Sequence, residues 1–254
     1  MSPKLFMKIA YFNCSSGISG DMIISCLLNT GVCSAGRLEK ILKSGLRIKN
    51  WRLKVERTER NDLPCLRTRI IGDMEFSSPK EIRNIIAGSK FNSSIKQKSI
   101  RILNTLIEGE SRVHNINKNK VHFHEINSID TLIDIVASVY LVHRIAVEKI
   151  VCSKINIGCP APCALQIAKS KKVPVYSTNS RFELATPTGM AIISNIADEF
   201  GELPQMEVGK FGFGTGTLGI PGQSNLLRLI VGNYTPDDFR RKILKSRHGG
   251  YLRQ

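Results

Sequence analysis

One short segment of the chain is crowded with side chains of the kinds that bind metal ions. Two imidazoles and three carboxylates fall within the thirteen residues 122–134, at His122, His124, Glu125, Asp130 and Asp134. Neutral imidazole suits nickel, zinc or iron, and carboxylates are common companions in such sites. The segment therefore predicts a binding site for a divalent transition metal.

The expected local structure would bring these side chains together. If the sequence VHFHE (121–125) is extended, His122 and His124 project to the same face. If a helix follows, Asp130 and Asp134 lie one turn apart on one helical face. The alternative is that the histidines are hydrogen-bonded core residues and that Asp130 serves the helix start. Five ligand-type residues in so short a segment favour the metal site.

The sequence SSGISGD (15–21) is a candidate anion-binding turn between a strand-like run and a helical run. Its glycines permit a tight turn, and its serines with the free N–H groups of the next helix can bind an anion. The spacing is neither a P-loop nor a dinucleotide fingerprint, and many such turns contain glycine for steric reasons alone. The candidate binding residues are Ser16, Gly17, Ser19 and Gly20. Asp21 is either a functional carboxylate or one that the helix dipole favours.

Two further glycine-bearing segments repeat this pattern. In ATPTGMAII (185–193), Thr186 or Thr188 can cap a helix and Gly189 lets the backbone approach a ligand. The segment 209–225 contains six glycines and predicts a loop, either a binding loop or a flexible connection. Its candidate binding residues are Gly214 and Gly216.

Composition narrows the class of protein. The 254 residues suffice for one large domain or two small ones. The net charge of +16 suits nucleic acid or a small polyanion such as a nucleotide, but the basic residues are spread and the aromatic residues, at 6%, do not interleave with them. This pattern argues against a surface that stacks single-stranded nucleic acid.

Nothing in the sequence predicts a membrane span or a signal peptide, since no apolar run reaches roughly 18 residues. The seven cysteines are an odd number and form no CxxC pair, which indicates a reducing compartment. Cys159 and Cys163 are interpreted as incidental thiols in a turn. We expect a cytoplasmic protein.

Strand-like and helical patterns alternate along the chain, which predicts an α/β or α+β layered sandwich. The expected strands are 7–14, 51–60, 66–73, 148–158 and 225–232. The expected helices are 21–32, 35–46, 77–89, 92–115, 131–147, 161–170 and 186–200. We expect one domain over 1–232 and a loosely ordered basic tail over 233–254.

Taken together, the motifs resemble the N-terminal domain of the nickel insertion protein of the nickel-pincer nucleotide pathway. They occur in family order from about Met7 to Gly232. The matching segments are GISGDM (17–22), VHFHE with its downstream aspartates (121–136), PAP (160–162), TPTGMA (186–191), GFGTG (212–216) and NLLR (225–228).

The resemblance implies nickel insertion (cyclometallation) into a pyridinium bis-thiocarboxylic acid mononucleotide, a chelatase reaction of the lyase class. It also implies CTP hydrolysis with manganese or magnesium. His122, His124, Glu125, Asp130 and Asp134 would hold the metal, and the glycine turns would hold the phosphate of the mononucleotide. Asp21 and Glu125 are the candidate catalytic carboxylates.

The chain departs from the family pattern in four ways. Asn13 stands where the family commonly has an aspartate, Asn127–Ser128 replaces Gly-Ala, and Gly158–Cys159 lacks a His-Gly. As a fourth departure, we expect the family's C-terminal, CTP-associated domain to be separately encoded as a CTP-binding partner, and we allow for a homo-oligomer. The departures keep open a metal- or nucleotide-binding accessory protein without turnover. A basic nucleic-acid-binding protein ranks third, since charge alone supports it.

Overall fold

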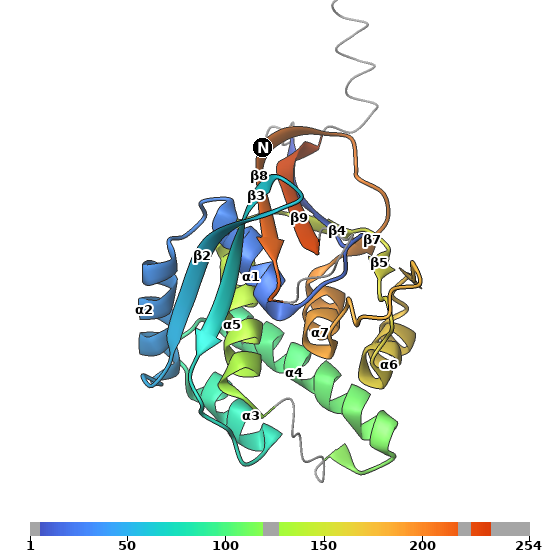
Figure 1. Ribbon diagram of the computed structural model, residues 1–254. Helices are drawn as coiled ribbons and strands as arrows, with labels where there is room; N and C mark the ends of the chain where they lie inside the picture. The colour runs from blue at the N-terminus through green and yellow to red at the C-terminus, as the bar shows by residue number, and fades with distance from the viewer. Residues whose placement is uncertain (1–5, 119–126, 218–224, 235–254) are drawn as a thin grey trace, which may run out of the picture.

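A mixed seven-stranded sheet forms the frame of the protein (Figure 1). The computed structural model describes residues 6–118, 127–217 and 225–234. The strand order is β2-β3-β8-β9-β1-β4-β7, and β5 and β6 form a separate two-stranded sheet. The strands are β1 (Met7–Asn13), β2 (Arg52–Arg60), β3 (Leu63–Ile71), β4 (Lys149–Cys152), β5 (Ile155–Asn156), β6 (Val175–Tyr176), β7 (Glu199–Phe200), β8 (Met206–Thr215) and β9 (Leu226–Tyr234).

Strand β1 lies inside the sheet, parallel to β4 and antiparallel to β9. Its residues 9–12 are all buried, which explains their continuous apolar sequence. Alternate side chains serve opposite faces: Ala10 and Phe12 join the main core, and Ile9 and Tyr11 join a small cluster with Val151. The described helices gather on the side of the main core.

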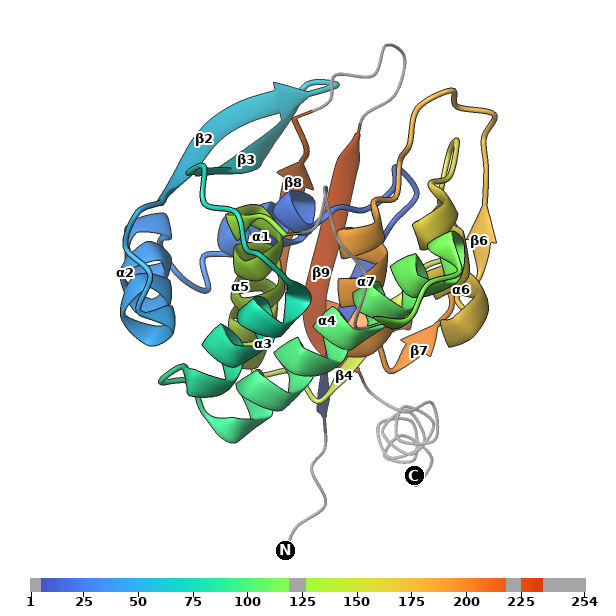
Figure 2. The ribbon, with the colours of Figure 1, turned by 90° about the horizontal axis from the view of Figure 1, so that it is seen from below.

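Helix α1 lies directly on the sheet against β8, β3 and β9, and α5 packs on α1. Helix α4 crosses α5 and α7 on the side away from the sheet (Figure 2). The helices are α1 (Gly20–Asn29), α2 (Ala35–Leu46), α3 (Pro79–Gly88), α4 (Ser93–His114), α5 (Ile129–Ile145), α6 (Pro162–Lys171) and α7 (Pro187–Ile196). Since α1 lies between strands and helices, nearly every side chain from Met22 to Leu28 is buried.

The expected mixture of strands and helices is confirmed; the helix predicted over 35–46 has the bounds of α2, and the other expected helices are present with shifted ends. The predicted helix over 186–200 ends at Ile196, because 199–200 pair with β4 as β7. The predicted strand over 148–158 is divided into β4 and β5. Strand β9 continues to Tyr234, two residues beyond the predicted domain end, and 235–254 lie outside the described residues.

The prediction of a loop over 209–225 is wrong for 209–215, which belong to β8. The glycines there serve packing. A Cβ on Gly214 would overlap the Met22 carbonyl oxygen and the Cys26 amide nitrogen, and a Cβ on Gly212 would overlap the Cys26 carbonyl oxygen. Glycine thus lets the backbone of β8 touch the backbone of α1.

Two features bear on the expected compartment. No helix among the described residues is both long and apolar enough to cross a membrane. All seven cysteines are free thiols, and Cys159 is the one that is exposed.

The packing of β8 on α1 predicts the cost of a side chain at Gly214. Gly214→Ala should lower the free energy of unfolding by about 2–3 kcal/mol, because rigid backbone must move to admit the methyl group. Urea unfolding measures this change. Gly36→Ala is the matched control: no atom lies within 4 Å of its Cβ position, and the change should be below about 1 kcal/mol. Equal urea midpoints for the two variants would contradict the packing role.

Candidate functional site

The turn after β1 holds the beginnings of α1 and α7 side by side. Gly17 has a φ of +90°, and its N–H donates to the Cys14 carbonyl at 3.0 Å. Ile18 then bridges to the segment before α7: its N–H donates to the Leu184 carbonyl at 2.8 Å, and its carbonyl accepts from Thr186 N at 3.0 Å. Two helix N-termini, each favourable to an anion, therefore lie at the same place.

The start of α7 follows the sequence prediction closely. Pro187 is its first residue, and the Thr186 hydroxyl accepts from Gly189 N at 3.1 Å as an N-cap. A Cβ on Gly189 would lie 2.7 Å from Ser19 Cα. Glycine is therefore needed at position 189 because the backbone of Ile18 and Ser19 lies against it.

Asp21 is held by three contacts in the first turn of α1. Its Oδ1 accepts from the Ser19 hydroxyl and from Met22 N, the latter at 2.8 Å. Its backbone carbonyl accepts from the Thr68 hydroxyl of β3 at 2.9 Å. The carboxylate is thus fixed in direction by Ser19 and Met22, and the backbone of Asp21 is tied to the sheet.

Asp130 and Asp134 come from the start of α5, where Ser128 caps the helix by accepting from Thr131 N. They are one turn apart, as predicted. Asp134 lies against Gly20, the first residue of α1: a Cβ there would overlap Asp134 Cγ and Oδ2. Gly20 therefore lacks a side chain to make room for a carboxylate.

The carboxyl group of Asp134 is buried and poorly compensated. Its Oδ1 is inaccessible and has no hydrogen-bond partner among the described residues. Desolvation, followed by the charges of Asp21 and Asp130, raises its pKa well above the usual value. An unpaired buried carboxylate is costly, so at neutral pH this group favours either a proton or a cation.

The neighbouring carboxyls are shifted in the same direction. Desolvation raises the pKa of Asp21, and the hydrogen bonds from Ser19 and Met22 oppose the rise. The pKa of Asp130, at the surface, is raised by desolvation and by the charge of Asp21. The three aspartates form one electrostatic cluster, which a divalent cation would stabilise.

The cluster does not complete a metal site by itself. Within 6–118, 127–217 and 225–234, no group of three or more His, Cys, Asp or Glu side chains is placed to hold a metal ion. The predicted ligands His122, His124 and Glu125 lie outside the described residues. Of the predicted ligands and catalytic carboxylates, the structure places Asp21, Asp130 and Asp134 close enough for their charges to interact.

The remaining predicted binding residues divide into two groups. Ser16 and Thr188 are half-buried beside the two helix starts, and the Thr188 hydroxyl makes no hydrogen bond with a described residue. Gly214 is placed by its contact with α1, whereas the Cβ position of Gly216 meets its nearest atoms only at 3.6 Å. The first group remains suited to a ligand, and Gly214 is explained by packing.

Sequence reasoning assigned no role to Arg228, which lies beside the turn. Arg228 pairs with Asn13 in the β1–β9 register, and its Nη1 donates to the Ser15 hydroxyl at 3.4 Å. Asn13 Oδ1 accepts from Ser15 N at 3.0 Å. The NLLR segment, an arginine after two leucines at a strand start, was the available signal. It places a guanidinium near the helix N-termini.

Comparison with known proteins identifies one family. A family model described as "Nickel insertion protein" matches residues 10–248. No solved structure matches the chain.

Individual relatives carry related names. The "Putative nickel insertion protein" of Syntrophobacter fumaroxidans is 36% identical, over 94% of this chain and 64% of the relative. The "Pyridinium-3,5-bisthiocarboxylic acid mononucleotide nickel insertion protein" of Geobacillus kaustophilus is 31% identical, over 90% of this chain and 61% of the relative. The chain spans somewhat less than two thirds of the length of these relatives.

The raised pKa of Asp134 predicts a pH-dependent effect of Asp134→Asn in metal-free protein. Because the pKa is higher in the folded state, the folded state keeps a proton that the unfolded chain releases above about pH 4. The free energy of unfolding of the wild-type protein therefore falls as pH rises from about 4 toward the raised pKa of Asp134, whereas that of the asparagine variant does not. The stability advantage of Asp134→Asn should grow from pH 4 to pH 8.

Urea unfolding at pH 4, 6 and 8 in the presence of a chelator measures this difference. Asp73→Asn, at an exposed position, is the control and should shift stability little at any of these pH values. An advantage of Asp134→Asn that is constant or shrinks with pH would argue against a protonated Asp134.

Proposed function

The chain belongs to the nickel insertion protein family, and from this premise we propose that it inserts nickel into a pyridinium-3,5-bisthiocarboxylic acid mononucleotide. The observation that carries the proposal is the buried carboxyl of Asp134 beside Asp21 and Asp130, whose Oδ1 has no hydrogen-bond partner among the described residues. Nickel is the cargo of this reaction.

The carboxylate cluster supports the metal half of the proposal. Without a cation, desolvation and mutual repulsion favour the protonated form of Asp134. A divalent cation reverses this balance, because it supplies the missing partner and the ionised form becomes favourable. We assign His122, His124 and Glu125 as the additional ligands, since imidazole is a preferred nickel donor.

The two helix N-termini support the nucleotide half. Backbone N–H groups at the starts of α1 and α7 favour a phosphate, and beside them lies the Thr188 hydroxyl, which makes no hydrogen bond with a described residue. Arg228 adds a guanidinium, the side chain best suited to a phosphate. In this arrangement the phosphate end of the mononucleotide binds the helix starts, and its thiocarboxylates extend toward the aspartates.

Cyclometallation replaces a ring proton of the substrate by the metal, so a base must receive that proton. Asp21 and Glu125 are the proposed bases. The Asp21 carboxylate has a fixed direction, from Ser19 and Met22 N, and lies beside the other two aspartates. Its raised pKa makes it a better proton acceptor than an ordinary aspartate.

We keep CTP with manganese or magnesium, a separate CTP-binding partner and a cytoplasmic location as predictions. An accessory role without turnover is the second candidate. Asn13 favours it, because the position beside Arg228 and Ser15 carries an amide rather than a carboxylate. Mass spectrometry of the mononucleotide after incubation with nickel and the chain, with and without CTP, distinguishes the two: nickel incorporation supports insertion, and bound but unincorporated nickel supports the accessory role.

The metal-binding part of the proposed function predicts stoichiometric nickel binding. Calorimetric titration of untagged, metal-stripped protein should give one site, which the double variant His122→Ala/His124→Ala loses. Asp134→Asn should weaken the affinity at least tenfold, because the buried anionic partner is gone, a change of about 1.4 kcal/mol.

His114→Ala/His143→Ala is the matched control. It also removes two histidines, both exposed, from the far ends of α4 and α5, and it should bind nickel like the wild type. Circular dichroism establishes equal folded content for all variants. Nickel binding that is the same in every variant would exclude the site.

A further inference from the structure

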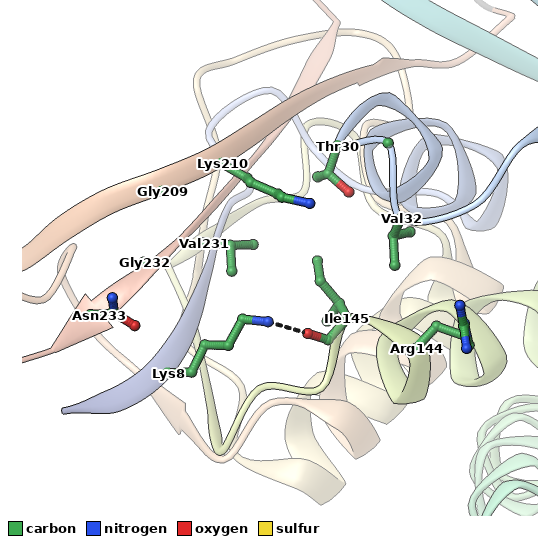
Figure 3. Close-up of a pocket in the computed structure, with 11 residues that line it drawn as sticks. Lys8, Thr30, Val32, Arg144, Ile145, Gly209, Lys210, Val231, Gly232 and Asn233 are labelled. Carbon is green, nitrogen blue, oxygen red and sulfur yellow. Dashed lines mark hydrogen bonds between the residues drawn. The ribbon is translucent and has the colours of Figure 1, made fainter. Parts of the chain in front are cut away.

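A cavity lies at the opposite ends of the two helices that carry the aspartates (Figure 3). It has a volume of about 430 Å³ and is lined by residues that follow α1, end α5 and belong to β1, β8 and β9. The ten residues of α1 span about 15 Å and the seventeen of α5 about 25 Å. The cavity is therefore separate from the aspartate cluster and shares no residue with it.

Strand β8 creates the cavity where α1 ends. Gly214 and Gly212 face α1, and a Cβ on Gly212 would lie 3.0 Å from Thr30 N, just past the last turn. Lys210 is the next residue of β8 on the same side as Gly212. It lies beyond the end of α1 and follows a β-bulge at Gly209. In Figure 3 the Lys210 side chain extends across the cavity toward Thr30.

The charge of the cavity is one-sided. Lys8, Arg144 and Lys210 line it, and none of its eleven lining residues is Asp or Glu. Lys8 has a structural partner, since its Nζ donates to the Ile145 carbonyl at 2.6 Å. The side chains of Arg144 and Lys210 make no ion pair or hydrogen bond with a described residue. Glu148 lies nearby and accepts the Lys8 backbone N–H, but it does not line the cavity.

The remaining walls are apolar or open. Val32, Ile145 and Val231 contribute aliphatic surface. Gly31 has a φ of +77°, and no atom of a described residue lies within 4 Å of its Cβ position. Cavities of this size, with apolar walls and a few polar groups, are typical small-molecule sites.

We propose that this cavity binds a small phosphate ester, with the phosphate at Lys210, the exposed Arg144 at the rim, and the organic group against Val32 and Val231. Two cations that make no ion pair with a described residue suit a dianionic phosphate, and the aliphatic walls suit the ester group. The site is independent of the proposed nickel insertion and gives the chain a second ligand.

Phenyl phosphate tests the proposal, because it joins a phosphate to an apolar ring, and inorganic phosphate tests the contribution of the ring. Amide NMR shifts of Gly31 and Gly209 report binding at this cavity alone. We expect saturable shifts of both amides with phenyl phosphate, and at least tenfold weaker binding of inorganic phosphate. In Lys210→Ala/Arg144→Ala, the Kd of phenyl phosphate should rise at least tenfold.

Lys154→Ala is the control, since it removes an exposed cation that does not line the cavity. Its Kd at Gly31 and Gly209 should stay within twofold of wild type. Both cavity substitutions are at exposed positions, so folding should survive them, and the amide spectrum verifies this. The proposal would be overturned if phenyl phosphate shifted neither amide, or if both variants lost affinity for phenyl phosphate equally. Equal affinity for phenyl phosphate and inorganic phosphate would overturn the role of the apolar wall.

Discussion

The contact between Gly20 and Asp134 is the constraint on which the candidate site depends. It brings the first turn of α1 against the first turn of α5, with a carboxylate where packing would otherwise favour an apolar side chain. Because Asp134 Oδ1 is buried and has no hydrogen-bond partner among the described residues, the contact is costly when the carboxyl is ionised. In the proposed site, a divalent cation would compensate these carboxylates.

The surrounding fold keeps this contact in place. Helix α1 is packed between the sheet and α5, and Gly212 and Gly214 allow β8 to touch its backbone. Thr68 ties the Asp21 carbonyl to β3, and Ile18 ties the start of α1 to the start of α7. The same helix therefore presents a cation-seeking cluster at its beginning and a basic cavity at its end.

Much of the site was predictable because its signals are local. Helical spacing places Asp130 and Asp134 on one face, and Thr186 before Pro187 marks a helix start. The proximity of Asp21 to Asp134 was not predictable from either motif alone, because they are more than a hundred residues apart and meet only through the packing of α1 on α5.

The errors have physical reasons as well. The glycines of 209–215 indicate a loop when only local propensity is considered, yet in β8 they are required by the backbone of α1. The basic cavity combines Lys8, Arg144 and Lys210 from three distant elements, so no sequence window could reveal it. Arg228 acquires its significance from the β1–β9 register, which the sequence does not display.

The most direct test is to follow the carboxyl carbon of Asp134 by NMR through a pH titration, with and without zinc as a diamagnetic substitute for nickel. In metal-free protein the carboxyl should titrate above the usual aspartate range. With one equivalent of zinc it should stay ionised to lower pH, because the cation stabilises the charged form. An identical titration in both samples would show that Asp134 does not face a metal and would contradict the proposed site.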